Sequence, residues 1–423
     1  MTGKEEGETF ELVAQCLCQA QRFTAKIPCS ALPLTAIYCH CTSCRRVTGA
    51  LHSTYVPWPG DGEAIRAAAS SSSPLRRYVF AGPLTLLSCG VCGSTMFVET
   101  AGSSSDGSGA SPPQYGVTTG VLANHTPPPS AGIPGLGIPG LLRIAHHVFV
   151  GDTLDGGATP WLCDANADGS RPRLWRGRRG SEEELSSTTH RWPLPPSDAS
   201  PADETPVRCH CGGVDLVLRQ PIADFAAKER SELPWFVDPV SNKSLGGFDA
   251  CDSCRLSSGV DVFHWTFVLL RHLAFPGPKS GGDVQRPTGF PASSVELKDA
   301  VAAAPPDRDP RWGTLTFYES SPDVQRYFCS RCSACVFYAA DDRPELVDLA
   351  IGLLDSKNGS RAEELVSWDF GGKMVWRQDV VGGWREAFVE SIEAAADRWR
   401  IERGYPKNWR RIQKEEAAVK DEK

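Results

Sequence analysis

The sequence contains little methionine, no long apolar run and no excess of positive charge. Only three of its 423 residues are methionine, and its apolar stretches, such as residues 263–270, are too short to span a bilayer. The formal net charge of −7 and the absence of a long basic tail argue against a nucleic-acid-binding surface. The first residues, 1–6, are polar and acidic, unlike a secretory signal or a transit peptide. We therefore expect a cytoplasmic protein, with the nucleus as the alternative compartment, and neither nucleic acid nor a membrane as a partner.

Glycine, proline and cysteine are abundant instead. The 40 glycines and 33 prolines favour many short strands and turns over long helices, which predicts a mainly β fold. A chain of this length usually holds roughly two or three domains. The 16 cysteines, in a chain that we expect to be intracellular, indicate bound metal before disulfides.

The cysteines follow a pattern that occurs twice along the chain. In the first half, a C-x-C pair, a C-x-C-x-x-C-R-x-x-x-G segment and a C-x-x-C pair follow one another. In the second half both pairs return, and the middle segment returns with aspartate at its first position. Tyr78 and Tyr318 each precede a C-x-x-C pair by eleven residues. This repeat is the strongest sign of organisation in the sequence, and it predicts two tandem modules.

The boundaries of the modules follow from changes in composition. We expect the first module at residues 10–165 and the second at residues 206–385, joined by a polar linker at residues 166–205. Residues 101–113 and 124–141 are rich in serine, glycine and proline, which is typical of flexible insertions within the first module.

Residues 386–423 differ from both modules. Between Trp384 and Arg400, apolar side chains recur at helical spacing among charged residues, namely Phe388, Ile392, Ala395 and Trp399. This pattern predicts an amphipathic C-terminal helix. Residues 414–423 are charged, and we expect them to fray.

Each module contains two separated cysteine pairs that match a closed zinc site with four thiolate ligands. The candidate ligands are Cys16, Cys18, Cys89 and Cys92 in the first module, and Cys209, Cys211, Cys329 and Cys332 in the second. Glycines beside the C-x-x-C pairs favour tight turns that direct two sulfurs to one point. Structural zinc of this kind contributes about 10–16 kcal/mol of apparent binding free energy, comparable to the stability of a domain. The alternative, eight unrelated buried cysteines, does not explain the repeated spacing.

Cys39, Cys41 and Cys44, which we call the first trio, are surplus to the closed site and form a candidate catalytic zinc site. Three thiolates and one exchangeable position let a bound zinc take up an incoming thiol as its thiolate. The alternative is a second structural zinc that is completed by a distant histidine or by water. His40 lies between two ligands and is interpreted as a spacer. Arg45 is a candidate partner for a carboxylate of the ligand, with a surface ion pair as the alternative.

The second module has an altered trio. Asp249 takes the first position beside Cys251 and Cys254, so this second trio is a candidate metal site with harder, less thiophilic donors. We therefore expect the second module to be weaker than the first, or inactive, as a catalyst. Several other residues with metal-ligand chemistry are interpreted as core residues: Cys29, Cys163, Cys335, His146, His147 and His264.

The order of these motifs resembles the glutathione-dependent formaldehyde-activating enzyme family, which includes centromere protein V. The resemblance runs through most of residues 10–165 and again through 206–385, where Asp249 and Ser333, the latter in place of a glycine, are departures. It implies two tandem zinc-bearing β-tent modules of small antiparallel sheets. It also implies that the four-cysteine sets hold structural zinc and that the first trio holds a labile zinc beside a thiol-binding cleft.

The activity that the resemblance implies is a carbon–sulfur lyase step, in which glutathione and formaldehyde form S-hydroxymethylglutathione. The favoured hypothesis is a zinc-dependent enzyme acting on glutathione or a related thiol adduct, with Arg45 and Arg46 as candidates to hold its carboxylates. A first alternative is a non-catalytic zinc scaffold that mediates protein–protein interaction through the tandem modules and the C-terminal helix. A second is a chromatin or cytoskeletal role, which the acidic balance disfavours.

Overall fold

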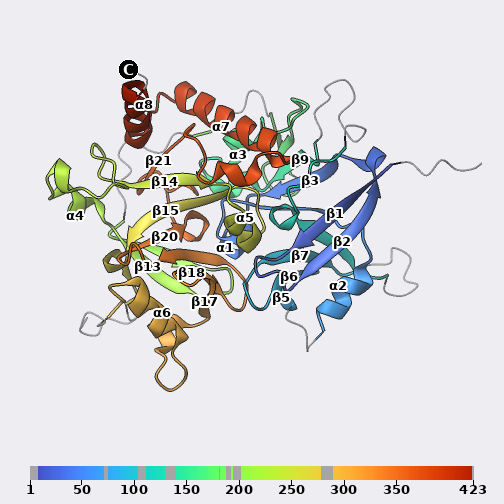
Figure 1. Cartoon of the computed structure of the whole chain (residues 1–423), viewed down its shortest axis with the longest axis horizontal. Coiled ribbons are helices and arrows are strands. Elements are labelled where there is room, and N and C mark those ends of the chain that lie inside the picture. Colours follow the sequence, from blue (N-terminus) through green and yellow to red (C-terminus); the bar gives the residue numbers. More distant parts are fainter. Residues whose placement is uncertain are drawn as a thin grey trace, which may run out of the picture.

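The computed structural model describes residues 8–70, 75–102, 111–128, 140–180, 182–186, 192–193, 202–277 and 289–421. The middle parts of both predicted insertions, 101–113 and 124–141, and much of the second half of the predicted linker lie outside these residues. The described residues form four sheets, of two, nine, three and seven strands, with short helices between them (Figure 1). The fold is mainly β, as the composition predicts. Within the described ranges, no helix is both long and apolar enough to cross a membrane.

A two-stranded sheet and a nine-stranded sheet build the first half of the chain. Their strands are β1 (Thr9–Gln15), β2 (Arg22–Pro28), β3 (Leu34–Cys39), β4 (Ser53–Pro57), β5 (Leu75–Ala81), β6 (Leu84–Cys89), β7 (Thr95–Thr100), β8 (Gln114–Thr118), β9 (Leu142–Val148), β10 (Arg173–Trp175) and β11 (Glu184–Leu185). The helices are α1 (Thr42–Thr48), α2 (Gly62–Ala68) and α3 (Thr159–Leu162). In β2, Phe23, Ala25 and Ile27 alternate with exposed residues, so one face of the strand joins the core.

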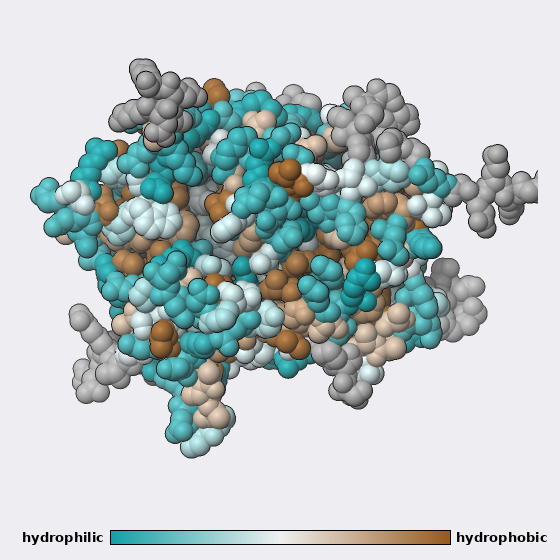
Figure 2. All heavy atoms as spheres, viewed as in Figure 1, coloured by the Kyte–Doolittle hydropathy of each residue, from teal (hydrophilic) through white to brown (hydrophobic). Residues whose placement is uncertain are grey.

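The second half has a three-stranded sheet and a seven-stranded sheet. Its strands are β12 (Glu204–Arg208), β13 (Asp215–Arg219), β14 (Ser244–Asp249), β15 (Phe263–Leu269), β16 (Leu273–Ala274), β17 (Leu315–Ser321), β18 (Val324–Cys329), β19 (Cys335–Ala340), β20 (Leu346–Ala350) and β21 (Val366–Trp368). Its helices are α4 (Ile222–Ala226), α5 (Asp252–Ser258), α6 (Ser294–Ala302), α7 (Arg385–Glu402) and α8 (Trp409–Asp421). Hydrophilic residues cover most of the face shown in Figure 2, and apolar residues form small separate patches on it.

The two halves share one strand order. The seven-stranded sheet runs β17-β18-β19-β20-β15-β14-β21, and the first half contains β5-β6-β7-β8-β4-β3-β9 in the corresponding order. The register is also the same, because Tyr78 pairs with Leu86 as Tyr318 pairs with Arg326. Residues that correspond in the cysteine repeat therefore occupy corresponding places in two similar sheets.

The nine-stranded and the seven-stranded sheet are mostly antiparallel, but each also contains parallel neighbours. Strands β9 and β21 run parallel to β3 and β14, respectively. Two parallel neighbours need a long connection between them. Strands β9 and β21 meet this need because each lies about 100 residues or more after its partner in the chain. The alternation of apolar residues along a strand does not reveal which distant strand lies beside it, so the sequence did not predict these pairs.

Part of the predicted linker, 166–205, is folded onto the first half. Strand β10 pairs in parallel with β9, and β11 pairs with β10, so both extend the nine-stranded sheet. Leu174 and Leu185 are buried in these short strands. These strands have only three and two residues, and the segments around them are polar, so the sequence did not predict them.

Matching turns lock the two halves together. Helices α1 and α5 lie in the middle of the molecule, between the strands of the two halves (Figure 1), and end at Gly49 and Gly259 with φ near +80°. The backbone N–H of Gly352 donates to the carbonyl of Gly49 at 2.9 Å, and that of Gly120 donates to Gly259 at 3.0 Å. Each half thus binds the end of the other half's helix through a close backbone contact that only glycine permits.

A buried ion pair lies at the same interface. Arg385, the first residue of α7, is fully buried, and its Nε donates to Oδ1 of Asp261 at 2.8 Å. Its Nη2 donates to the carbonyl of Thr119 in the first half at 2.6 Å. The hydroxyls of Thr119 and Tyr38 donate to Oδ2 of Asp261. Burial lowers the pKa of Arg385 to about 9, so the pair depends on these contacts to stay charged.

The predicted C-terminal helix is present as α7, and Phe388, Ile392, Ala395 and Trp399 are buried on it. The sequence predicts that residues 414–423 fray, but in the structure α8 continues to Asp421. Arg411 explains the difference, because it pairs with Asp397 at 2.7 Å and with Glu415, four residues along α8, at 3.0 Å.

The glycine contacts between the halves predict a position-specific loss of stability. A Cβ atom on Gly352 would lie 2.1 Å from the carbonyl oxygen of Ala50, which is backbone and cannot move aside. Gly352→Ala should therefore lower the free energy of unfolding by about 1–3 kcal/mol, measured by urea denaturation. Gly277→Ala is the control, since no atom lies within 4 Å of its added Cβ. Equal stability of the two variants would contradict the interlocked interface.

The buried ion pair predicts a second effect. Asp261→Asn keeps the shape of the side chain but leaves Arg385 charged and without its counterion. The free energy of unfolding should fall by about 3–5 kcal/mol. Glu184→Gln, which removes the partner of exposed Arg173, should leave it nearly unchanged, because an exposed ion pair contributes little to stability. Similar losses in both variants would show that the Arg385 pair does not hold the halves together.

Candidate functional site

The four cysteines predicted to form the first closed site converge in space. Cys16 and Cys18 follow β1, whereas Cys89 and Cys92 lie at the turn between β6 and β7. The Sγ atoms of Cys16 and Cys18 are 3.5 Å apart, and those of Cys18 and Cys89 are 3.6 Å apart. A tetrahedral zinc with Zn–S bonds of 2.3 Å requires sulfurs about 3.8 Å apart. All four cysteines are free thiols, so their geometry fits a tetrathiolate metal site.

The second closed site repeats this geometry. The Sγ atom of Cys211 lies 3.6 Å from that of Cys209 and 3.5 Å from that of Cys329, and Cys332 completes the group. The backbone N–H of Val214 donates to Cys209 at 3.2 Å, as Gln21 does to Cys16. Such N–H donors favour the thiolate form that a metal needs.

Ser333 stands where the first half has Gly93, and it does not change the turn. It follows Cys332 with φ +62°, close to the +75° of Gly93 in the first half. Its hydroxyl contacts that of Ser88 in the first half. The serine therefore adopts the same left-handed conformation as the glycine, held by a contact between the halves.

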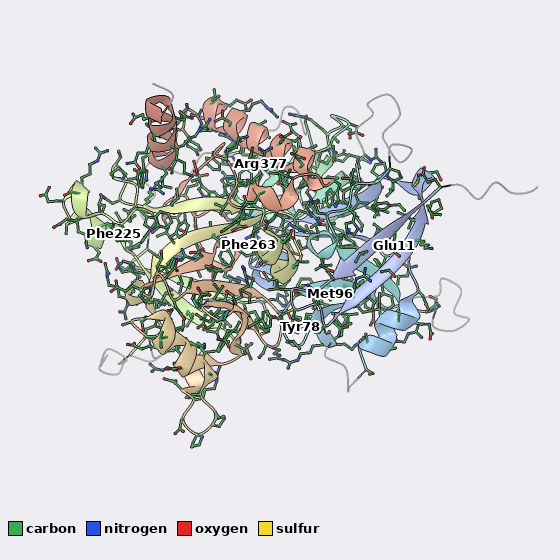
Figure 3. The ribbon with its side chains drawn as sticks, viewed as in Figure 1. Glu11, Tyr78, Met96, Phe225, Phe263 and Arg377 are labelled. Carbon is green, nitrogen blue, oxygen red and sulfur yellow. The ribbon has the colours of Figure 1, made fainter. Side chains whose placement is uncertain are left out.

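Each closed site also lies beside a hairpin of the other half. The hydroxyl of Tyr78 on β5 is 2.7 Å from Nδ1 of His210, the residue between Cys209 and Cys211. Figure 3 shows Tyr78 where the strands of the two halves meet. Burial and the nearby thiolates of Cys332 and Cys211 raise the pKa of Tyr78 to about 12. Tyr318 lies correspondingly near the first closed site, since burial and then the charge of Cys18 raise its pKa. The sequence repeat includes both tyrosines, but it does not predict that they lie near the closed site of the opposite half.

The first trio also converges. Cys39 ends β3, Cys41 precedes α1 and Cys44 lies in the first turn of α1, and their sulfurs lie within 4.8 Å of one another. Within the described residues, no fourth histidine, cysteine or carboxylate joins this group. The thiols of Cys39 and Cys44 donate hydrogen bonds that lower the pKa of Cys41 to about 3. Three donors without a fourth protein ligand fit a metal that keeps an exchangeable position.

Arg45 does not have the expected orientation. Its guanidinium is buried and donates to the carbonyl of His40, to Oγ1 of Thr42 at 3.2 Å and to the carbonyl of Asp152 at 3.5 Å. Side chains on a helix lean toward its N-terminus, which directs Arg45 back to the trio loop. Arg45 thus braces the loop, and the predicted contact with a ligand's carboxylate does not fit this orientation. Arg46 instead pairs with Asp355 of the second half at 2.8 Å.

The histidines near the first trio lie outside its donor group. His40 is fully buried, and its Nε2 is 2.8 Å from Nδ1 of His147, so it does not join the neighbouring thiols. His52 and His264 are also fully buried beside them. Burial lowers the pKa of all four imidazoles, which keeps them neutral in the core.

The second trio is assembled in the same way as the first. Asp249, Cys251 and Cys254 are each partly or fully enclosed, and one donor atom of each lies within 4.8 Å of the others. Oδ1 of Asp249 accepts from the backbone N–H of Cys251 at 2.8 Å, and the Sγ atom of Cys251 accepts from Cys254 at 3.2 Å. Cys335 is buried in β19 and lies outside this group. Asp249 therefore takes the place that Cys39 has in the first half.

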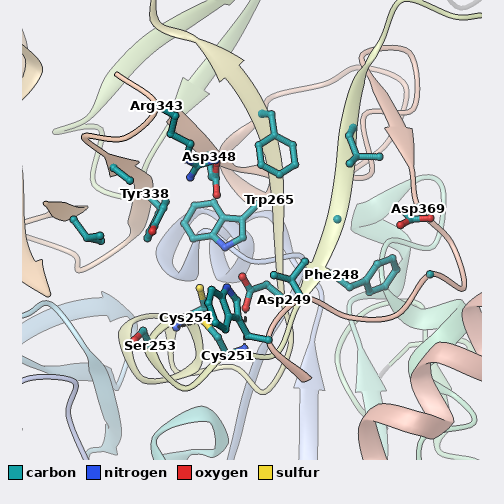
Figure 4. Close-up of a pocket in the computed structure, with 18 of the residues that line it drawn as sticks. Phe248, Asp249, Cys251, Ser253, Cys254, Trp265, Tyr338, Arg343, Asp348 and Asp369 are labelled. Carbon is teal, nitrogen blue, oxygen red and sulfur yellow. Dashed lines mark hydrogen bonds and ion pairs between the residues drawn. The ribbon is translucent and has the colours of Figure 1, made fainter. Parts of the chain in front are cut away.

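A cavity of about 680 Å³ opens beside the second trio. Figure 4 shows Asp249, Cys251 and Cys254 together at one end of it, with Trp265 and Tyr338 nearby. The weaker activity predicted for this module rests on the replacement of a cysteine by Asp249 and takes no account of the cavity. The walls of the cavity come from β14, β15, β18, β19, the loop after β21, and α8, and no local motif could reveal that they meet.

Arg326 is a residue at this site that no sequence motif points to. It is 8 % exposed, and its Nη1 donates to Sγ of Cys254 at 3.5 Å. Burial lowers its pKa, but the charges of Cys254 and Cys251 outweigh that effect and raise it overall. The corresponding residue of the first half is Leu86. Aligning the two halves by their cysteines would have exposed this change from leucine to arginine.

The closed sites and the first trio predict different losses on substitution. Cys89→Ser should lose one bound zinc and most of its folding stability, since such zinc contributes about 10–16 kcal/mol. Cys41→Ser should lose one labile zinc and remain folded, and Cys29→Ala, outside all four groups, should keep all its metal. Elemental analysis gives zinc per chain, and circular dichroism gives thermal stability. A Cys89→Ser protein with unchanged metal content and stability would contradict the closed site.

Comparison with known proteins gives one match. No curated protein and no solved structure matches the chain. The matched segment contains the first closed site and the first trio, and the second half lies outside it. The likeness to centromere protein V is not confirmed. Residues 11–133 match the model of the family described as glutathione-dependent formaldehyde-activating enzyme, which confirms the resemblance for this segment.

Proposed function

We propose that the first half of the chain is a zinc-dependent carbon–sulfur lyase that interconverts glutathione plus formaldehyde with S-hydroxymethylglutathione. The observation that carries the proposal is the first trio: three converging sulfurs without a fourth protein donor, inside the segment that matches the family. The donor set is soft and its charge is negative, which suits Zn²⁺. The same reasoning assigns structural zinc to the two four-cysteine sites.

The reaction forms one C–S bond. The thiol sulfur adds to the carbonyl carbon of formaldehyde, the C=O π bond breaks, and the thiol proton ends on the new hydroxyl oxygen. Bound zinc supplies stabilisation of the thiolate at neutral pH. The chain's own contribution is rigidity, because Arg45 ties the carbonyls of His40 and Asp152 together and thereby holds the trio loop. The N–H of Cys44 donates to Cys41 and favours its thiolate.

The domain organisation proposed from the sequence fits this assignment. We propose residues 10–165 and 206–385 as two modules, followed by a helical segment at residues 386–423, and the strand order that both halves share supports this division. Residues 166–205 connect them, with β10 and β11 belonging to the first sheet. The free thiols suit a reducing compartment, for which we propose the cytoplasm, with the nucleus as the alternative.

The first trio predicts where activity is lost. Cys41→Ser should reduce the catalysed rate to the spontaneous background, because the metal site loses one of its three protein ligands. NMR exchange spectroscopy measures the interconversion of glutathione and its formaldehyde adduct at equilibrium. Cys254→Ser, which alters the second trio, and Cys29→Ala should both keep the rate of the unchanged protein.

A chelation experiment completes this test. Mild chelation should remove the labile metal and the activity together, and added Zn²⁺ should restore both. If Cys41→Ser folds, lacks one zinc and still shows no rate difference from the unchanged protein, the lyase assignment is wrong. That result would favour the alternative of a zinc scaffold that mediates protein–protein interaction.

A further inference from the structure

We propose that Cys251 and Cys254 form a redox-active dithiol, which exchanges with a small disulfide that carries both ammonium and carboxylate groups. Arg326 keeps a metal ion out of the second trio, so the two sulfurs stay available. Both cysteines lie outside the segment that matches the family. Their exchange uses no metal and is independent of the lyase activity proposed for the first half.

Arg326 places a positive charge where a metal ion would have to bind. Its side chain is 8 % exposed, and its Nη1 donates to Sγ of Cys254 at 3.5 Å. Its Nε donates to Oγ of Ser320 at 3.2 Å, and its guanidinium lies over the ring of Tyr338 at 5.0 Å, so it is held in this place. A metal ion bound to Cys254 would lie close to this guanidinium, and two positive charges in a buried group repel each other strongly. Leu86, the corresponding residue of the first half, carries no charge.

The donor set of the second trio also suits a soft metal less well than that of the first. Asp249 replaces a sulfur donor by a hard carboxylate oxygen. Its Oδ1 already accepts from the backbone N–H of Cys251 at 2.8 Å. The loss of a soft donor and the gain of a fixed cation act in the same direction. The labile zinc that the resemblance implies for the first trio therefore does not fit the second.

Cys251 and Cys254 have the placement of a reversible disulfide. Cys251 immediately precedes α5, and Cys254 lies in its first turn. Their Sγ atoms lie within 4.8 Å of each other, and the backbone N–H of Cys254 donates to Sγ of Cys251 at 3.2 Å. Both are free thiols, and both line the cavity of about 680 Å³. A C-x-x-C pair at the start of a helix allows its two sulfurs to bond with the helix in place.

One row of side chains across the second sheet forms a wall of this cavity and has a different character in the first half. Its members are direct neighbours on β18, β19, β20 and β15, and all line the cavity: Arg326, Tyr338, Asp348 and Phe267. The corresponding residues of the first half are apolar or lack a side chain: Leu86, Val98, Gly116 and Pro57. Figure 4 shows Tyr338 and Asp348 beside the space that adjoins Cys251 and Cys254. The polar wall is therefore a feature of the half that carries the dithiol.

The charges on the cavity wall indicate the class of disulfide. Six aspartates and five arginines or lysines line the cavity, so both signs are present in nearly equal number. Asp348 pairs with Arg343 at 2.8 Å. Burial raises the pKa of Asp369, and the nearby charge of Lys414 on α8 opposes that rise. A substrate with one sign of charge meets like charges on this wall, whereas a substrate with ammonium and carboxylate groups can match both signs.

The exchange conserves atoms and electrons. Cys251 is the attacking residue, because Sγ of Cys254 is engaged by Arg326. The sulfur of Cys251 attacks one sulfur of the substrate, the S–S bond of the substrate breaks, and half of the substrate leaves as a thiol with the proton from Cys251. The sulfur of Cys254 then attacks that of Cys251 and releases the other half as a second thiol. The dithiol is oxidised to a disulfide while the substrate is reduced to two thiols.

The experiment uses reduced full-length protein and four disulfides: amphoteric cystine, neutral bis(2-hydroxyethyl) disulfide, cationic cystamine and anionic dithiodiglycolate. Remaining thiols are alkylated, and mass spectrometry follows the tryptic peptide 244–255, whose only cysteines are Cys251 and Cys254. We expect this peptide to lose two hydrogen atoms. Each rate is divided by the rate of dithiothreitol with the same disulfide, and this ratio should be about tenfold higher for cystine than for the other three. Equal ratios would overturn the amphoteric class, and a peptide that stays reduced with all four would overturn the exchange.

Two variants identify the role of each cysteine. Cys254→Ser should stop at a mixed disulfide on Cys251, which adds half of the substrate to the peptide, because the second attack is lost. Cys251→Ser should take up no substrate, and Cys29→Ala, outside the cavity lining, should react like the unchanged protein. A mixed disulfide on Cys254 in Cys251→Ser, with none in Cys254→Ser, would overturn the assigned order.

Metal analysis tests the role of Arg326. The unchanged protein and Cys254→Ser should contain the same amount of zinc, because the second trio holds none. In the background of Asp249→Cys, which restores the first-half donor, Arg326→Leu should raise zinc affinity at the second trio about tenfold, whereas Arg326→Lys should not. Zinc that is lost in Cys254→Ser, or equal affinity with leucine and arginine, would overturn this role. Neither readout uses lyase activity, so failure here leaves the proposed function of the first half standing.

Discussion

The convergence of four sulfurs at each closed site is the constraint on which the rest of the structure depends. Neighbouring Sγ atoms lie 3.5–3.6 Å apart although they come from turns that are distant in the chain. Four thiols at this distance cannot all ionise without a cation, because like charges in a buried group repel strongly. A metal ion held by the four sulfurs would remove that repulsion and would join two hairpins in each half. The strand order around both sites then repeats because the same two hairpins must meet.

The interface between the halves makes the two sites interdependent. Gly120 and Gly352 bind the helix ends of the opposite half, and Asp261 and Arg385 form a buried ion pair beside them. The hairpin that carries Tyr78 reaches the closed site of the second half. A change at one closed site therefore affects packing at the other, and the two halves are expected to unfold together. This arrangement fits a duplicated module whose copies pack through corresponding surfaces.

The two trios show how one framework accommodates different chemistry. The first keeps three thiolates and turns its arginine away, whereas the second exchanges Cys39 for Asp249 and Leu86 for Arg326. The guanidinium of Arg326 donates to Sγ of Cys254, one of the three potential donor atoms of the altered trio. The large described cavity then lies beside the altered trio. The donor atoms of the second trio therefore still converge although one cysteine of the motif is replaced.

The amino-acid sequence by itself determined the mainly β class, the four groups of residues that could hold a metal ion and the amphipathic helix α7. These features depend on local spacing and on a repeat, and both are visible without knowing which segments meet. Only the tertiary structure decided that Arg45 braces a loop, that β10 and β11 join the first sheet, and that Arg326 faces Cys254. It also placed Trp235 and Trp376 around one cavity. These features arise from packing between distant segments, and the direction of a side chain at such a contact is not encoded by its neighbours in the chain.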